Sequence, residues 1–119
     1  MKILLVEDDA WLAELEAGVL ASAGYEVQVA PHAPAAIELV DSFSPDVIVL
    51  DVLLAGSTAF ALLNELQSYS DTGIVPVILC TNIADQFDAV KMKEYGVKRV
   101  VDKTTMHPDD LVAAVRSVL

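Results

Sequence analysis

The stretch PDVIVLDV, residues 45–52, decides how this chain folds. Its four consecutive aliphatic residues, 47–50, run directly into one carboxylate, Asp51, and Pro45 marks the start of the run. An uninterrupted apolar run of this length is typical of a parallel strand that is covered on both faces. Asp51 is then predicted to lie at the carboxyl end of this strand, at the edge where open parallel sheets bind their ligands.

The rest of the chain repeats one alternation of strand and helix. Each segment that is typical of a strand is followed by a segment with apolar residues at the spacing of a helix. This pattern predicts an α/β fold of the flavodoxin-like type, a doubly wound parallel sheet of five strands with five helices. Besides the strand that ends at Asp51, strands are expected at residues 3–6, 26–30, 75–80 and 98–102.

The composition of the strands predicts their order in the sheet. Residues 3–6, 45–52 and 75–80 are mainly apolar and should lie in the interior. Residues 26–30 and 98–102 carry polar side chains and should form the two edges. A doubly wound sheet in the order 2-1-3-4-5 satisfies both conditions. Right-handed crossovers then put the first and fifth helices on one face of the sheet and the other three on the opposite face.

The first helix should lie between two clear signals. Asp9 stands where a capping side chain is expected at its start, and Gly24 stands where the helix is expected to end. Apolar residues recur between them at helical spacing and are expected to face the sheet. These residues are Leu12, Leu15, Val19 and Leu20.

The fourth helix, expected from about Ala84 to Tyr95, has the weakest apolar anchor of the five. Phe87 and Val90 in its middle are expected to hold it against the sheet, while charged residues crowd its later turns. Gly96 is expected to end it. Because it has so little apolar surface to bury, it should be the least firmly held helix.

Length and composition bound the class of protein. A chain of 119 residues has the size of one domain, and we expect a single domain over residues 1–119 with no output domain. The single cysteine, Cys80, excludes an internal disulfide. The chain shows no signal peptide and no apolar run of the roughly 18 residues that a membrane span needs, so we expect a soluble protein of a reducing compartment. The net charge of -11 argues against direct binding of nucleic acid.

Five chemical groups follow the predicted strands and should meet at the carboxyl edge of the sheet. Three carboxylates brought together repel one another, so a cation is expected among them. Oxygen ligands with room for water favour Mg²⁺. The lysine and the hydroxyl of the set are then placed to meet the oxygens of a phosphoryl group. The five residues are Glu7, Asp8, Asp51, Thr81 and Lys103.

This ordered set of strand ends resembles the receiver domain of two-component response regulators, and the resemblance covers the whole chain. It implies that Asp51 accepts a phosphoryl group from a histidine kinase or a phosphotransfer protein. It also implies that Asp8 and Asp51 ligate Mg²⁺ with a backbone carbonyl near Leu53, and that Glu7 assists through water. The chain would then be a phosphoacceptor switch that catalyses only its own phosphorylation and dephosphorylation, not an enzyme.

The resemblance also implies roles for the two remaining groups and for partners. Lys103 would neutralise the phosphoryl oxygens, and Thr81 would hydrogen-bond one of them and carry the signal to a downstream protein. The expected setting is the cytoplasm, without membrane contact. The expected oligomeric state is a monomer or a weak, phosphorylation-dependent dimer.

The chain departs from the family's pattern at several positions. Val100 stands where the family usually has an aromatic residue that swings inward, and Thr104 stands where a proline usually follows the lysine. These departures support an alternative, a receiver-like interaction module that signals without phosphorylation. An FMN-binding flavodoxin-like protein shares the sheet order but needs a Ser/Thr-rich phosphate loop after the first strand. Residues 7–9 are acidic there and would repel the phosphate.

Overall fold

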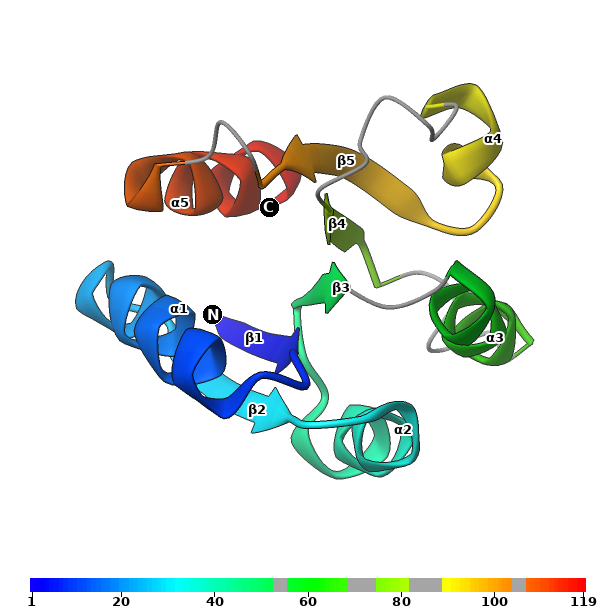
Figure 1. The fold of residues 1–119 in the computed structure, drawn as a ribbon, viewed down its shortest axis with the longest axis horizontal. Coiled ribbons are helices and arrows are strands. Elements are labelled where there is room, and N and C mark those ends of the chain that lie inside the picture. Colours follow the sequence, from blue (N-terminus) through cyan, green and yellow to red (C-terminus); the bar gives the residue numbers. More distant parts are fainter. Residues whose placement is uncertain (53–55, 69–74, 82–88, 104–106) are drawn as a thin grey trace.

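A five-stranded parallel sheet with helices on both faces makes up the fold (Figure 1). The computed structural model describes residues 1–52, 56–68, 75–81, 89–103 and 107–119. The strand order is β2-β1-β3-β4-β5, which confirms the predicted doubly wound fold. The strands are β1 (Lys2–Val6), β2 (Glu26–Ala30), β3 (Val47–Val52), β4 (Val77–Thr81) and β5 (Val97–Asp102). The helices are α1 (Ala10–Ser22), α2 (Ala33–Phe43), α3 (Gly56–Gln67), α4 (Ala89–Lys93) and α5 (Pro108–Val118).

The helices lie on the two faces that right-handed crossovers predict. α1 and α5 cover one face, and α2, α3 and α4 cover the other (Figure 1). Successive residues of β1 point alternately to the two layers, so Ile3 and Leu5 pack under α1 and α5. Leu4 and Val6 pack under the other three helices. In the part of the chain that the structure describes, no helix combines the length and the apolar character needed to cross a membrane.

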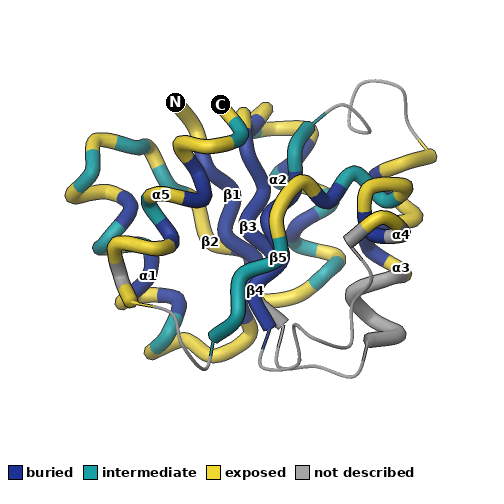
Figure 2. Tube along the Cα trace, turned by 90° about the horizontal axis from the view of Figure 1, so that it is seen from above, coloured by how far each residue is buried: buried dark blue, intermediate teal, exposed yellow. Residues whose placement is uncertain are grey.

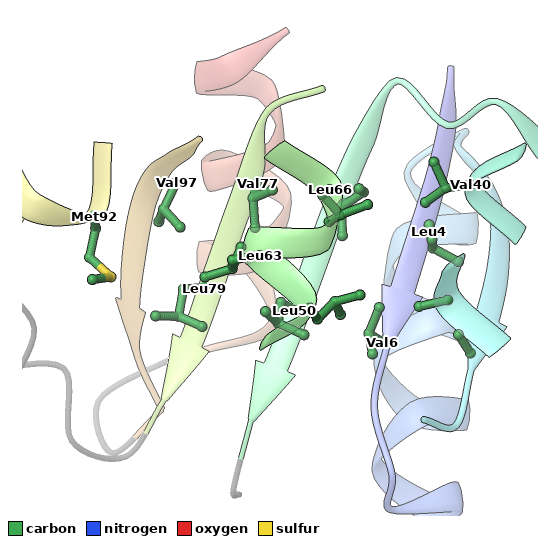
Figure 3. Packing of buried hydrophobic residues seen from close by; sticks show 14 residues of the cluster. Leu4, Val6, Val40, Leu50, Leu63, Leu66, Val77, Leu79, Met92 and Val97 are labelled. Atoms are coloured by element: carbon green, nitrogen blue, oxygen red, sulfur yellow. The ribbon is translucent and has the colours of Figure 1, made fainter. Parts of the chain in front are cut away.

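The interior of the sheet is a continuous apolar surface. β1, β3 and β4 are buried over most of their described length, whereas the edge strands β2 and β5 are more exposed (Figure 2). Over the face of α2, α3 and α4, Leu63 and Leu66 of α3 lie in one cluster with Leu79 of β4 (Figure 3). This packing confirms the assignment of interior and edge strands from composition.

The inward face of α1 differs from the prediction. Leu20 is buried as expected, but Leu15 is 52% exposed, and the other two predicted residues are only half-buried. The further buried positions are Ala13 and Glu16. Apolar side chains occur on more than one side of this helix, so helical spacing alone does not identify the face that meets the sheet. The small residue Ala13 takes one of the inward positions, and Leu15 lies at the surface.

α4 differs from the prediction in its anchor. Val90 is 72% exposed, whereas Met92 is 3% exposed and joins the core cluster. Residues two apart on a helix do not share a face, so only one of these two can meet the sheet. Gly96, with φ of 81°, follows the end of the helix as expected. The predicted start at Ala84 and the second predicted anchor, Phe87, lie outside the described residues.

A register shift interrupts the pairing of β4 with β5. Ile78 pairs with Arg99 where a regular ladder would pair it with Lys98, so one residue of β5 forms a bulge. Arg99 turns toward α5, where its Nε donates a hydrogen bond of 3.0 Å to Ser117 Oγ. After the shift the ladder is regular again up to Thr81, which brings the ends of β4 and β5 level.

Candidate functional site

The acidic run that follows β1 divides into three environments. Glu7 is 1% exposed. Its N–H donates to the carbonyl of Ala30 at the end of β2 (3.0 Å), and its Oε1 accepts from the N–H of Asp9 (2.9 Å). Asp8 is exposed. Asp9 Oδ1 accepts hydrogen bonds of 3.0 and 3.1 Å from two backbone N–H groups in the first turn of α1, which confirms Asp9 as a helix cap.

A buried ion pair connects the ends of β1 and β5. Lys103 Nζ lies 3.9 Å from Glu7 Oε2, and the two side chains are 9% and 0% exposed. The N–H of Lys103 donates to the carbonyl of Thr81 (2.9 Å), which fixes the lysine backbone beside the end of β4. Because neighbouring strands lie about 4.8 Å apart, β1 and β5 are separated by roughly 14 Å at this edge. The pair therefore crosses the ends of β3 and β4, the two strands between them.

The strand ends that this pair crosses carry Asp51 and Thr81. The backbone of Asp51 pairs with Cys80 in β4, and the next residue, Val52, pairs with Thr81. Thr81 is 3% exposed. The register thus brings both residues to the same edge of the sheet as the ion pair. The side chain of Asp51 and the whole of Leu53 lie outside the described part of the chain.

The donor atoms at this edge suit a hard cation. Glu7 and Asp8 offer carboxylate oxygens from adjacent residues, and carboxylate oxygens are ligands that Mg²⁺ takes. Among the side chains that the structure describes, no three are grouped as a metal site, and the third predicted carboxylate, Asp51, is not one of them. Lys103 offsets part of the cost of burying the Glu7 carboxylate. The residues present therefore fit the predicted magnesium site in their chemistry.

Comparison with known proteins assigns the family. A model of the response regulator receiver domain matches residues 3–116. The chain belongs to this family. Its fold and its strand order are those of a receiver domain of two-component signalling.

Individual relatives agree with this assignment. The DNA-binding response regulator MtrA of Mycobacterium tuberculosis is 34% identical over 118 residues, which cover 99% of this chain and 50% of MtrA. This receiver domain spans about half the length of the curated relatives it matches. The chemotaxis response regulator CheY4 of Vibrio cholerae has a TM-score of 0.83 at 25% identity, and the match covers 99% of this chain and 98% of that one. The response regulator TrrA of Thermotoga maritima shares the fold, with a TM-score of 0.81 at 23% identity and the same two coverages.

Two contacts of the receiver domain were not predicted. Sequence reasoning placed Glu7 and Lys103 at one edge, but nothing in the sequence indicated that they would pair. The two side chains meet only because both are long enough to reach across the two strands between them. His32 is exposed. It also caps α2, because its Nδ1 accepts a hydrogen bond of 3.1 Å from the N–H of Ala35. A proline shortly after a histidine, at Pro34, was the available signal for this cap.

Proposed function

We propose that this receiver domain is a phosphoacceptor switch and that Asp51 carries the phosphoryl group. The observation that supports it most is the buried Lys103–Glu7 pair, 3.9 Å long, which crosses the end of β3, the strand of Asp51. A lysine held at this point supplies a fixed positive charge where a phosphoryl group on Asp51 would bring negative charge.

The proposed reaction moves a phosphoryl group from a histidine of a partner protein to Asp51. A carboxylate oxygen of Asp51 attacks phosphorus, an O–P bond forms as the N–P bond breaks, and the imidazole leaves with the electron pair and takes up a proton. Lys103 gives up part of its contact with Glu7 and binds the phosphoryl oxygens. The Thr81 hydroxyl donates to another of these oxygens, which draws the end of β4 toward Asp51. Later attack by water on phosphorus restores the carboxylate and releases inorganic phosphate.

Magnesium fits this proposal through the acidic residues at the edge. Asp8 and Asp51 would bind it directly with the Leu53 carbonyl, and Glu7 would assist through water. When bound, Mg²⁺ supplies positive charge that stabilises the transferred phosphoryl group. Among proteins of this fold, TrrA of Thermotoga maritima has been solved in complex with Mg²⁺ and BeF.

The phosphoryl donor, the downstream partner and the cellular compartment follow from the same proposed reaction. The phosphoryl donor is a histidine kinase or a phosphotransfer protein, as the relation to two-component response regulators favours. This domain catalyses its own phosphorylation and dephosphorylation and passes the change on to a downstream protein. We place this reaction in the cytoplasm, where the buried thiol of Cys80 would stay reduced.

Intact mass spectrometry tests the assignment of Asp51. The protein is incubated with a small phosphodonor and Mg²⁺, beside Asp51→Asn and the control Asp41→Asn, which removes the same charge from an exposed position of α2. We expect one added phosphoryl group in the wild type and in the control, and none in Asp51→Asn. A phosphoryl group on Asp51→Asn would assign the reaction to another residue.

The same experiment tests the alternative of an interaction module. Val100 of β5 is an aliphatic residue that packs against the core cluster of α2, α3 and α4, so it offers no ring to move behind Thr81. If no donor phosphorylates the wild type, the protein signals by binding alone, and the phosphoacceptor proposal is wrong.

A further inference from the structure

A surface groove runs between α1 and α5, along the outer side of these two helices. Its volume is about 1060 Å³. One stripe of each helix lines it: residues at spacings of three and four on α1, from Trp11 through Leu15 and Gly18, and on α5 from Asp109 to Arg116. Trp11 is 70% exposed and Leu15 is 52% exposed, so this face of α1 presents large apolar side chains to solvent. Clustered exposed apolar residues in a groove are typical of an interaction site.

The α1 side of the groove combines a projecting side chain with a depression. Gly18 lies two turns after Trp11, on the same stripe. A Cβ at Gly18 would meet no atom within 4 Å, so open space lies over this position. A glycine inside a helix is destabilising relative to alanine, and no positive φ requires one here. A side chain of another molecule can therefore contact α1 directly at Gly18.

The charged residues that line the groove are acidic near one end and basic at the other. Asp109 lines its start and Arg116 its end, seven residues or roughly 10 Å apart along α5. Glu14 adds a second acidic group in the first half of α1. Among the described side chains neither Asp109 nor Arg116 forms an ion pair within the chain. Because α1 and α5 both run back from the carboxyl edge, they are parallel, and the groove as a whole has an acidic start and a basic end.

We propose that this groove binds the same groove of a second copy of the chain, with the two related by a two-fold axis that passes between Glu14 and Leu15 on α1 and between Val112 and Ala113 on α5. Such an axis sets the copies antiparallel. Arg116 of each copy then meets the partner's Asp109, and Trp11 of each copy covers the open space at the partner's Gly18. Both matches follow from the same seven-residue spacing, which is why a self-complementary contact fits. The inference does not depend on phosphorylation of Asp51.

The strong net charge of the chain bounds the strength of this dimer. Two copies at -11 each repel one another, and this long-range term is screened beyond about 8 Å at physiological salt. The contact is therefore weak, and added salt up to physiological strength should strengthen it. Two exposed Arg–Asp pairs set the orientation more than the affinity.

Trp11 provides a direct reading of dimer formation because it is the only tryptophan in the sequence. Sedimentation velocity and tryptophan emission are followed together up to about 1 mM protein, where association needs only about -4 kcal/mol. We expect a rise to the dimer mass together with a blue shift of the emission as Trp11 leaves water.

Charge reversals test the predicted orientation. Arg116→Glu and Asp109→Arg each turn two attractive contacts into two repulsive ones, and we expect each variant alone to dimerise on the order of tenfold more weakly. Mixing the two variants restores opposite charges at both contacts, so the mixed dimer should recover the wild-type affinity. Lys98→Glu and Asp41→Arg are matched controls at exposed positions outside the groove and should dimerise as their net charges dictate, with no recovery on mixing. Circular dichroism checks that every variant is folded.

Three outcomes would overturn the proposal. A protein that stays monomeric with unshifted Trp11 emission assigns the groove to a different partner. A dimer that both reversals leave unchanged uses another face. A dimer that both reversals weaken and that mixing does not restore lacks the two-fold pairing of Arg116 with Asp109.

Discussion

The two faces of the sheet are covered to different degrees. On the face of three helices, α3 buries Leu62, Leu63 and Leu66 to 4% exposure or less. On the face of two helices, α1 leaves Leu15 half in solvent, and a groove runs along the outer side of the contact between α1 and α5. Both faces of the strands are equally apolar, so the difference comes from the helices and not from the sheet. Complete burial of a strand therefore does not require that every large apolar residue of the helices above it faces the sheet.

A pair of leucine truncations gives the largest expected contrast between the faces. Leu63→Ala should lower the free energy of unfolding by about 3 to 4 kcal/mol, because it opens a cavity at a side chain that is 1% exposed. Leu15→Ala removes the same atoms from the groove side of α1 and should change stability by less than about 0.5 kcal/mol. Urea unfolding at low protein concentration measures both. Equal losses would show that the groove is packed in solution.

Two glycine substitutions separate the effect of open space from the effect of backbone conformation at α1. Gly18→Ala should raise stability by about 0.5 to 1 kcal/mol, because it improves helix propensity and its Cβ meets open space. Gly24 ends the helix as predicted and also has open space around a built Cβ, but its φ is 98°. Gly24→Ala should therefore lower stability by about 1 kcal/mol. Thermal unfolding measures the stability of both variants. If Gly18→Ala is destabilising, other atoms of the same chain occupy the space over Gly18.

The carboxyl edge of the sheet borders both faces. A substitution there gives the smallest expected change in stability. Asp8→Ala should raise stability without Mg²⁺ by at most about 1 kcal/mol, because it removes one of the charges that crowd Glu7. It should also abolish stabilisation by added Mg²⁺. Asp41→Ala on α2 is the control, with an exposed carboxylate far from the edge in sequence. Thermal shifts with and without Mg²⁺ measure both effects, and equal Mg²⁺ affinity in Asp8→Ala and wild type would remove Asp8 from the site.

Features with one dominant signal could be predicted from sequence. The apolar run of residues 47–50 fixed an interior strand, and Asp9 before the helical spacing fixed the start of α1. The inward face of α1 could not be predicted, because Leu15 and Leu20 support two different faces and only the fit of Ala13 to the sheet decides between them. The exposure of Val90 in the shorter helix α4 could not be predicted for the same reason, because the sequence does not show which face of the helix meets the sheet.

Some features of the site could likewise be predicted from sequence, and others could not. Parallel strands bring their carboxyl ends together, so the meeting of Glu7, Thr81 and Lys103 at one edge follows from strand order alone. The full burial of Glu7 and the exposure of Asp8 do not follow, because adjacent acidic residues look alike in a sequence. Their difference arises from the alternation of the chain as it leaves β1.

The bulge in β5 sets the phase of everything that follows it in the strand. Side chains of a strand alternate, so one added or removed residue sends all later side chains to the opposite face. Had Lys98 joined a regular ladder, Arg99 would pair with Leu79 and enter the apolar cluster under α4. In the structure the extra residue forms a bulge in the edge strand β5, and Arg99 reaches α5 instead. Deletion of Lys98 would leave the approach to Lys103 in phase, whereas deletion of Val100 with the bulge kept would invert it.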